Sequence, residues 1–478
     1  MAKVTCPLEK NALNAPHAIA LRTPEHNISW ALLKLVVDRV ILELENANID
    51  PGEILALSTA SKLTTTILLL ACIKRAVILC PLNPGLKTTQ IRAISKDIGV
   101  NHHLGPDESQ LKVIEQIIVT TLSSNSLNSK NLNDKAELPM NQGPVTWLDL
   151  DSAATLVMTS GSSGSPKAVL HSLANHYYSA CGSAKLIPLS HTDSWWLSLP
   201  LFHVGGLAII FRCLFSAATM VLDDSKDILK VLSQYPITHA SMVPTQVIRL
   251  LKMLSEKPQG LSLSTILIGG AAVPSSVVEA CKNLPWQVYD SYGLTEMSSQ
   301  VATKPISESG FRQPLAYRQW RLVNGEIQVR GKTLCLGYVT QGKLTQPFQD
   351  GWFATKDLAR TEDGKIHLVG RLDNMFICGG ENYQPEAIEQ ELLTHPDVIQ
   401  AIIVPIKDDT FGHIACALID CKNNALWQQI NDYLQQRIAK IYVPKHFLPW
   451  PENTGTGIKI NRKVLQQYAE QTLINTRL

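Results

Sequence analysis

Apolar residues in the first part of the chain follow helical and strand spacing in turn. Between residues 29 and 46 they recur every three or four positions, which predicts a helix with one buried face. These apolar positions are Trp30, Leu33, Val36, Val37, Val40 and Leu44. Short apolar runs at Ile54–Leu57 and Ala76–Cys80 predict strands, and the stretch Leu63–Leu82 predicts a buried helix followed by a strand. This alternation across residues 28–120 favours α/β layers.

A second alternating block runs from Trp195 to about Pro285. Its apolar runs predict strands within residues 194–200, 218–222, 239–243 and 265–270. Between residues 320 and 370 the alternation takes a two-residue period, as in Glu326–Arg330 and Lys365–Val369, with glycine-rich turns. This part is therefore predicted to be mostly β.

Mixed patterning returns after Arg371. Helices are expected at Pro385–Thr394 and Leu426–Lys440, and a strand at Ile399–Val404. A chain of 478 residues is too long for one core. The sequence predicts a large N-terminal domain, residues 1–370, of α/β layers plus a β-rich subdomain, and a small α+β C-terminal domain, residues 371–478.

A polar stretch, Ser123–Gly143, interrupts the first domain. It holds few apolar residues and is expected to be an exposed connector. It leads toward Thr159–Lys167, which contains only Thr, Ser, Gly, Pro and Lys and follows the predicted strand Ala154–Met158. Such a loop offers backbone N–H groups, hydroxyls and one cation, which together can wrap an anion. It lacks Walker A spacing, and a plain flexible turn is the alternative.

Composition narrows the class of protein. Lys and Arg total 43 against 41 Asp and Glu, so the formal net charge is only +2. This balance argues against nucleic acid and polybasic membrane partners. The start of the chain lacks the apolar core of a signal peptide, and Lys74 and Arg75 break the most apolar stretch, so no membrane span is expected. Ten cysteines are scattered without a C-x-x-C pair, which favours small core residues in a reducing cytoplasm over metal or disulfide use.

Four further motifs accompany the Thr159–Lys167 loop along the chain. They are Ser291–Glu296, Asp350–Asp357, Gly370–Asn382 and Gly455–Arg462. In this order the five segments resemble the acyl-adenylate-forming superfamily, which comprises acyl-CoA synthetases, adenylation domains and luciferases. The resemblance covers roughly residues 28–470 and implies an enzyme that uses ATP, Mg²⁺ and coenzyme A to convert a small-molecule carboxylic acid into a thioester.

Within the superfamily the chain looks most like the o-succinylbenzoate–CoA ligases of menaquinone biosynthesis. The segments behind this similarity are Leu199–Gly206, His239–Gln246, Gly269–Pro274, Arg371–Phe376 and Gly457–Arg462. The implied substrate is 2-succinylbenzoate. Three alternatives stay open: a ligase for another aromatic or medium-chain acid, an adenylation domain that loads a carrier protein, and a nucleotide-binding scaffold without catalysis. The sequence does not decide between a monomer and a homodimer.

The resemblance implies a nucleotide site. The β- and γ-phosphates would be held by Thr159, Ser160, Gly161, Ser162, Ser163, Gly164 and Lys167. Tyr292, with Gly293 beside it, would stack on adenine, and Gly270 and Ala271 would line the adenine pocket. Asp357 would accept from the ribose hydroxyls, and Arg371 would contact ribose or phosphate. Each also has an ordinary explanation, such as a core tyrosine or a surface salt bridge.

It also implies the catalytic residues. Thr295 would donate to the α-phosphate, Glu296 would hold Mg²⁺, and Lys459 would reach the oxygens that link the substrate carboxylate to the α-phosphate. Because Lys459 and the phosphate loop fall in different domains, the C-terminal domain is expected to be mobile, with Asp373 at its hinge. Gly379 and Gly380 would then approach the pantetheine arm of CoA, where missing side chains leave room.

The acyl pocket is predicted at His203, Gly205 and Thr245, with Gln246 nearby. Many relatives carry a serine at the position of Gly205. This departure either counts against recognition of an aryl carboxylate or shifts that recognition to water, His203 or another donor. His203 could instead cap a core strand. Trp195 and Trp196 are expected in the core.

Overall fold

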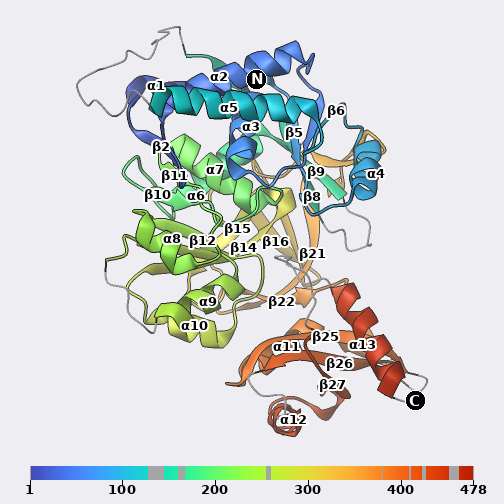
Figure 1. Cartoon of the computed structure of the whole chain (residues 1–478). Coiled ribbons are helices and arrows are strands. Elements are labelled where there is room, and N and C mark those ends of the chain that lie inside the picture. Colours follow the sequence, from blue (N-terminus) through green and yellow to red (C-terminus); the bar gives the residue numbers. More distant parts are fainter. Residues whose placement is uncertain are drawn as a thin grey trace.

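The chain folds into a large N-terminal body and a smaller C-terminal one, drawn in orange and red in Figure 1. The computed structural model describes residues 2–126, 145–159, 167–254, 260–378, 380–408, 411–421, 427–451 and 462–476. Within these residues, no helix is both long and apolar enough to cross a bilayer.

The first large sheet has eight strands, of which the six adjacent inner strands run parallel to one another. Its order is β15 (Ser299–Pro305), β14 (Gln287–Leu294), β13 (Thr265–Gly269), β12 (His239–Met242), β10 (Ser194–Trp196), β11 (Thr219–Val221), β2 (Ile19–Arg22) and β3 (Asn27–Ser29). The two edge strands, β15 and β3, are antiparallel to their neighbours. Because β13 and β14 are parallel, their carboxyl ends lie at the same edge, which is where ligands bind in α/β sheets.

The second large sheet has seven strands. Its order is β19 (Lys343–Thr345), β18 (Gly337–Thr340), β9 (Lys167–Ser172), β8 (Ala153–Thr159), β5 (Ile78–Pro81), β4 (Ile54–Leu57) and β6 (His102–Leu104). Strands β8 and β9 form an antiparallel hairpin around the predicted phosphate loop. Strand β18 adds to the other side of β9, so it brings residues far along the chain beside that hairpin.

Helices cover these sheets and fill the space between them (Figure 1). They are α1 (Pro7–Asn14), α2 (Trp30–Asn46), α3 (Lys62–Arg75), α4 (Thr88–Ile98), α5 (Ser109–Ser126), α6 (Leu173–Ala184), α7 (Val204–Ser216), α8 (Ile228–Gln234), α9 (Pro244–Leu254) and α10 (Ser275–Lys282). One hydrophobic cluster joins both sheets and their helices, with Leu21 of β2, Leu55 of β4, Ile67 of α3 and Ile210 of α7 all inaccessible to solvent. Burial on this scale holds the two sheets in fixed relation.

A β-rich part follows. Its strands are β16 (Arg318–Val323), β17 (Glu326–Gly331), β20 (Phe348–Gln349), β21 (Trp352–Glu362) and β22 (Lys365–Arg371). A short 3₁₀ helix, η2 (Thr295–Met297), links β14 to β15, and a small sheet pairs β1 (Lys3–Thr5) with β7 (Trp147–Asp149). The register of β21 with β22 places Asp357 opposite Arg371.

The C-terminal body has its own core, whose first buried residue is Cys378. Its elements are β23 (Phe376–Cys378), β24 (Glu381–Tyr383), α11 (Pro385–Leu392), β25 (Val398–Asp408), β26 (Gly412–Cys421), α12 (Trp427–Gln435), η4 (Lys440–Tyr442), β27 (His446–Pro449) and α13 (Arg462–Thr476). The prediction of a mixed α/β protein with a large and a small domain is confirmed. The boundary at residue 371 stays a prediction.

Most predicted elements are present, with corrected ends. Helix α2 buries all six of its predicted apolar positions. The polar connector begins later than predicted, because Ser123–Ser126 continue helix α5; the rest of Ser123–Gly143 lies outside the described residues. Helix α12 ends at Gln435 rather than at Lys440, and β25 is longer than the predicted strand.

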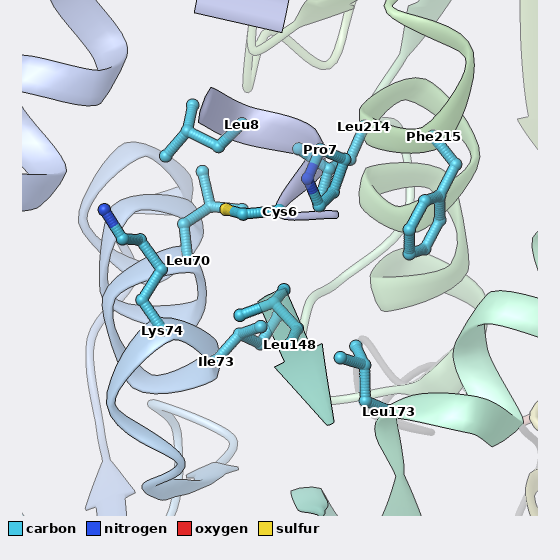
Figure 2. Close-up of a pocket in the computed structure, with 10 residues that line it drawn as sticks. All are labelled: Cys6, Pro7, Leu8, Leu70, Ile73, Lys74, Leu148, Leu173, Leu214 and Phe215. Atoms are coloured by element: carbon cyan, nitrogen blue, oxygen red, sulfur yellow. The ribbon is translucent and has the colours of Figure 1, made fainter. Parts of the chain in front are cut away.

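The cysteines lie where small apolar side chains would. None of the ten forms a disulfide, and eight are buried. Cys6 lines a gap of about 10 Å³ between α1, α3 and α7 (Figure 2), together with apolar side chains such as Leu70 and Leu214. A space of this size holds about one water molecule, so it is a packing gap and not a ligand site.

Candidate active site

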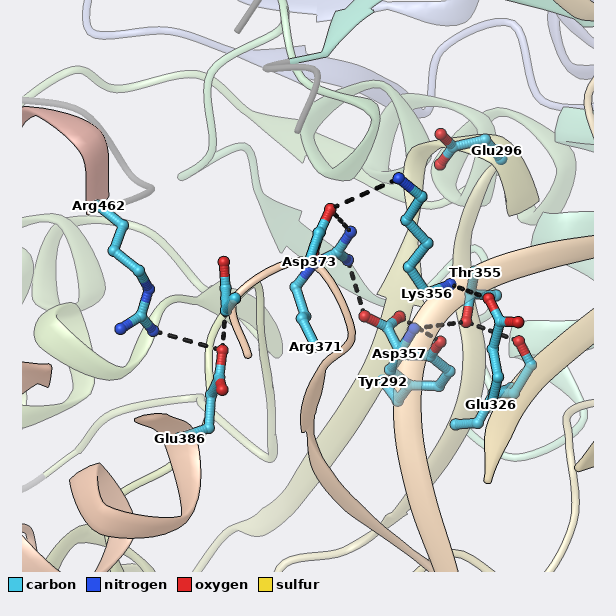
Figure 3. A network of polar contacts seen from close by, with 12 residues as sticks. Tyr292, Glu296, Glu326, Thr355, Lys356, Asp357, Arg371, Asp373, Glu386 and Arg462 are labelled. Atoms are coloured by element: carbon cyan, nitrogen blue, oxygen red, sulfur yellow. Dashed lines mark hydrogen bonds and ion pairs between the residues drawn. The ribbon is translucent and has the colours of Figure 1, made fainter. Parts of the chain in front are cut away.

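Three predicted nucleotide-site residues meet at the junction of β14, β21 and β22 (Figure 3). The phenol of Tyr292 donates to Asp357 Oδ2 across 2.6 Å, and Arg371 Nη1 lies 2.7 Å from Asp357 Oδ1. Arg371 Nε also lies 3.0 Å from Asp373 Oδ1. Asp357 is thus held from two sides, and each of its oxygens keeps a lone pair for a further donor such as a ribose hydroxyl.

The surroundings of Asp357 change its acidity. Burial raises the pKa of Asp357, while Arg371 and the hydrogen bond from Tyr292 act in the opposite direction. Burial and the nearby Asp357 charge raise the pKa of Tyr292 well above its ordinary value, so the phenol keeps its proton and donates. Glu296 also raises the pKa of Asp357, which places the two carboxylates within electrostatic range of each other.

Thr295 and Glu296 open the 3₁₀ helix η2, directly after β14. Two contacts fix the backbone of this turn. The buried His171 of β9 donates from Nε2 to the Thr295 carbonyl across 2.7 Å, and the Cys335 N–H donates to the Glu296 carbonyl across 2.7 Å. The half-buried Glu296 side chain accepts a hydrogen bond from the Tyr338 phenol, 2.7 Å from Oε1.

The predicted phosphate hairpin is described only at its base. Thr159 ends β8 and pairs with Lys167, the first residue of β9. Ser160, Gly161, Ser162, Ser163 and Gly164 lie outside the described residues. The ammonium of Lys167 lies over the ring of Tyr338, 4.9 Å from its centroid. Tyr338 therefore contacts both Lys167 and Glu296.

Glycines shape the neighbouring sheet edge. Gly270 follows β13, is exposed, and has a φ of +86°, a left-handed conformation that favours glycine. Ala271 beside it is exposed as well. A Cβ at Gly293 would lie 2.2 Å from the Ser299 carbonyl oxygen, so only glycine allows β15 to approach β14 at this point.

Tyr292 is 8% exposed and packs in a hydrophobic cluster, so most of its ring lies in the core.

The predicted acyl residues lie on two helices. His203 is the N-cap residue of α7, and its side chain makes no capping bond to that helix. Gly205 lies in the first turn of α7, and Thr245 lies exposed in the first turn of α9. Trp195 and Trp196 are 1% and 3% exposed, which confirms their predicted place in the core.

Arg212 is a candidate that the motifs did not reveal. It lies on α7 two turns after Gly205, hence on the same helix face, and is 5% exposed. Its Nη2 donates to Gln300 Oε1 across 2.7 Å, whereas its buried Nε has no partner. Among the residues that the structure describes, no carboxylate forms an ion pair with it. Burial lowers the pKa of Arg212 to about 10, so it remains charged at neutral pH. The sequence signal is one charge within the apolar run Val204–Phe215.

The hinge and C-terminal candidates are only partly described. Asp373 follows β22 and contacts Arg371, and Gly380 is exposed with a φ of +89°. Lys459 and Gly379 lie outside the described residues. One hollow of about 450 Å³ in the described surface is lined by residues such as Tyr317 and Arg330 and by none of the predicted site residues.

Comparison with known proteins decides the family. A model of the AMP-binding enzyme family matches residues 8–339, and a model of the AMP-binding enzyme C-terminal domain matches residues 387–457. The chain belongs to the AMP-binding enzyme family. The predicted resemblance to acyl-adenylate-forming enzymes is thereby confirmed.

Several AMP-binding enzymes similar to this chain are named 2-succinylbenzoate–CoA ligases. The protein from Escherichia coli is 32% identical over 462 residues, which cover 95% of this chain and 96% of that protein. The protein from Haemophilus influenzae is 38% identical over 327 residues, 67% of this chain and 72% of its own length. The protein from Bacillus subtilis is 28% identical over 92% of this chain and 93% of its own length.

Solved AMP-binding enzymes share the fold over nearly the whole chain. A variant of E. coli MenE with bound OSB-AMS superimposes with a TM-score of 0.84 at 28% identity, covering 99% of this chain and 100% of that one. The o-succinylbenzoate CoA synthetase from B. subtilis in complex with the acyl-adenylate OSB-AMP gives 0.83 at 25% identity, covering 98% and 99%. A complex of the B. subtilis enzyme with ATP and a magnesium ion gives 0.82, also at 25% identity, covering 98% and 100%.

Proposed function

We propose that this chain is an ATP-dependent acid–CoA ligase that converts 2-succinylbenzoate into 2-succinylbenzoyl-CoA, a step of menaquinone biosynthesis. Relatives that match it along almost their whole length carry this activity in their names. Solved relatives bind the acyl-adenylate OSB-AMP, or ATP with magnesium. The observation on this chain that favours a substrate with two carboxylates is Arg212, a buried cation with an unpartnered N–H.

The reaction has two steps. In the first, a carboxylate oxygen of the acid attacks the α-phosphorus of ATP, an acyl-AMP forms, and pyrophosphate leaves. In the second, the thiol of CoA attacks the acyl carbon, its proton is lost to solvent, and AMP leaves. Negative charge develops on phosphate or carbonyl oxygens in both steps, so fixed donors and cations supply most of the catalysis.

The described residues fit the nucleotide half of this reaction. Asp357 would accept from the ribose, since Tyr292 and Arg371 hold its carboxylate and leave lone pairs open. Gly270 and Ala271 would border the base at the exposed edge of the sheet. Lys167 would face the phosphates from the base of the β8–β9 hairpin.

Glu296 fits a magnesium ligand. Mg²⁺ takes carboxylate and phosphate oxygens, and bound with ATP it would neutralise phosphate charge. The Glu296 side chain is half-buried and commits Oε1 to Tyr338, which leaves Oε2 for a cation. Thr295, beside it in η2, would donate its hydroxyl to the α-phosphate. Lys459 remains the predicted cation for the oxygen that bridges acid and phosphate.

Arg212 would hold the second carboxylate of the acid. Transferring a charged guanidinium from water into the protein interior costs free energy, and a nearby opposite charge offsets that cost. Arg318, another buried arginine, donates to carbonyl oxygens of Gln300 and Ala316, so its demand for acceptors is met inside the protein. The Arg212 guanidinium still needs a hydrogen-bond acceptor, because its Nε has none. Gly205 lies on the same helix face.

The decisive assay incubates the enzyme with ATP, Mg²⁺, CoA and a panel of acids, and follows pyrophosphate release and thioester formation. Wild type should form a thioester from 2-succinylbenzoate faster than from benzoate or medium-chain acids, and Lys459→Ala should abolish pyrophosphate release. No product from 2-succinylbenzoate would refute the substrate assignment. Thioester formed with a carrier protein but not with free CoA would refute the ligase assignment.

The role of Arg212 has its own test. Arg212→Met should raise the KM for 2-succinylbenzoate by about tenfold or more and leave the KM for ATP unchanged, because only the acid loses a charged partner. Arg318→Met is the matched control: it should lower stability without changing the ranking of acids. Equal loss of selectivity in both variants would contradict the assignment.

The cytoplasm is the proposed compartment for this activity, since none of the ten cysteines forms a disulfide. Monomer and homodimer both stay open, and light scattering can distinguish them.

A further inference from the structure

Tyr338 occupies the space between two oppositely charged residues of the proposed site. Its phenol donates to Glu296 Oε1 across 2.7 Å, and its ring face receives the Lys167 ammonium 4.9 Å from the centroid. Neither role follows from the motifs, because the two partners lie on other elements: Lys167 opens β9, and Glu296 lies in η2. The pairing of β18 with β9, with Tyr338 opposite Val169, brings Tyr338 beside Lys167. The hydrogen bond from the Cys335 N–H to the Glu296 carbonyl joins η2 to the segment just before β18.

We propose that Tyr338 is a positioning residue that fixes the Glu296 carboxylate for Mg²⁺-bound ATP while it keeps Lys167 and Glu296 apart. The inference rests on the proposed function, since it assigns Glu296 to the metal and Lys167 to the phosphates. Tyr338 itself touches neither substrate nor metal in this assignment.

The first part of the argument concerns the Glu296 side chain. Contacts from His171 and Cys335 fix only the backbone of the turn. A glutamate with a fixed backbone still has three rotatable side-chain bonds. If these bonds become ordered only when the metal binds, the lost conformational entropy weakens metal binding. The phenol removes that freedom before the nucleotide arrives. It engages Oε1 alone, so Oε2 stays available.

The second part concerns charge. Within the described residues, no ion pair joins Lys167 to Glu296. If these side chains paired directly, each would neutralise the other and attract a metal–phosphate group less strongly. A phenol is a neutral donor, so it orients the carboxylate without removing its charge. Its ring attracts the ammonium through a cation–π contact and likewise leaves the lysine charged. Tyrosine offers both a neutral donor and a π face.

The third part concerns the rigidity of Tyr338. Its side chain is half-buried, and its ring packs edge-on against Phe353, with centroids 6.5 Å apart. It extends from a strand paired on both sides, with β9 and with β19. A donor fixed in this way can hold its partner in one place, whereas a mobile surface tyrosine could not.

The test is Tyr338→Phe, which removes the hydroxyl and keeps the ring under Lys167. Isothermal titration calorimetry should measure ATP binding with saturating Mg²⁺ and again with EDTA. We expect about five- to tenfold weaker binding with Mg²⁺ and little change without it, since only the metal-dependent part uses Glu296. Pyrophosphate exchange should show a matching rise in the KM for MgATP and an unchanged KM for the acid.

Tyr235→Phe is the matched control. The phenol of wild-type Tyr235 donates to Asp223 Oδ2 across 3.1 Å. The variant therefore loses a phenol–carboxylate hydrogen bond at a place with no assigned role. It should bind MgATP as wild type does. A second cycle combines Tyr338→Phe with Glu296→Gln: because the phenol acts through Glu296, the double variant should bind MgATP no more weakly than Glu296→Gln alone.

Two outcomes overturn the inference. Unchanged MgATP affinity in Tyr338→Phe would show that the phenol does not position Glu296. Tighter Mg²⁺-dependent binding would show that the phenol competes with the metal. Should Tyr338→Phe unfold in a thermal melt, Tyr338→Met takes its place. Effects of Tyr338→Met and Glu296→Gln on MgATP binding that add in the double variant would overturn the inference in the same way. Failure of the proposed function is distinct, since wild type would then show no acid-dependent pyrophosphate exchange at all.

Discussion

The phenol of Tyr292 and the carboxylate of Asp357 lie 2.6 Å apart, although 65 positions separate them in the chain. Tyr338 and Glu296 form a second phenol–carboxylate pair, 2.7 Å apart and 42 positions distant. In both pairs a neutral donor holds a carboxylate that the proposed function assigns to the nucleotide or its metal. Each carboxylate is thus oriented before ligand arrives and still keeps its charge, which is the condition for strong electrostatic binding.

Tyr292→Phe should weaken nucleotide binding without stopping the chemistry. The variant keeps the ring in its hydrophobic cluster but removes one of the two donors to Asp357. We expect the KM for ATP to rise about three- to tenfold and kcat to change little, as for the loss of one hydrogen bond to a charged group. The hydrogen bond lowers the pKa of Asp357, so its loss must raise that pKa. The acid limb of kcat/KM for ATP should therefore move to higher pH, and a shift to lower pH would contradict the arrangement.

Gly205→Ser should be tolerated and should improve binding of the acid. A Cβ at Gly205 would lie 3.2 Å from Leu199 Cδ1, the end of a flexible side chain that can move. The added hydroxyl lies on the helix face of Arg212 and supplies a donor to the same region. The KM for 2-succinylbenzoate should fall a few-fold, and the free energy of unfolding should change by less than about 1 kcal/mol.

Gly206→Ala provides the contrast for that measurement. Its Cβ would lie 2.2 Å from the Pro200 carbonyl oxygen, which is backbone and cannot turn aside. We expect a loss of about 2 kcal/mol or more in the free energy of unfolding. Equal tolerance of both substitutions in denaturation experiments would mean that α7 is not packed as the structure has it.

The sequence predicted those elements whose burial repeats with a period. Helix α2 was predicted because its six apolar positions are the ones that it buries. The start of the polar connector is predicted wrongly for the opposite reason. Ser123–Ser126 carry no apolar signal, yet they continue a helix that begins at Ser109 and packs on α2. Helix propagation past the last buried residue costs little once a helix has formed, and no local pattern reports it.

The candidate site likewise contains residues that the sequence can place and residues that it cannot. Motifs place Tyr292, Thr295 and Glu296 together because these residues are neighbours in sequence. They cannot place His171, Tyr338 or Arg212, whose contacts span 124, 42 and 88 positions. Such contacts depend on which strands pair and on the face that a helix turns inward, so only the folded chain shows them.

His171 should make stability depend on pH below neutrality. Burial lowers its pKa from 6.5 to about 4. Between these values the unfolded chain binds a proton that the folded chain does not, so stability rises with pH across this window and is lost as pH falls through it. The contribution is about 3 kcal/mol at most. His171→Gln keeps an N–H donor for the Thr295 carbonyl but does not titrate, so its urea midpoint should fall less than that of wild type between pH 6.5 and pH 4. Parallel pH profiles would mean that His171 is hydrated or charged in the folded protein.

Gly270→Ala should separate the role of this residue in the nucleotide site from its backbone strain. Gly270 has a φ of +86°, and a Cβ there would meet only Val243 Cγ1, at an ordinary 3.6 Å. Gly52 has almost the same φ, +85°, with nothing within 4 Å of its Cβ position. Both alanine variants should therefore lose a similar amount of stability, about 1 kcal/mol, from left-handed strain alone. Only Gly270→Ala should also raise the KM for ATP, because its methyl group would border the base. If the two variants bind ATP equally well, the base does not lie at the edge formed by β13 and β14, and Tyr292 then serves the core and Asp357 alone.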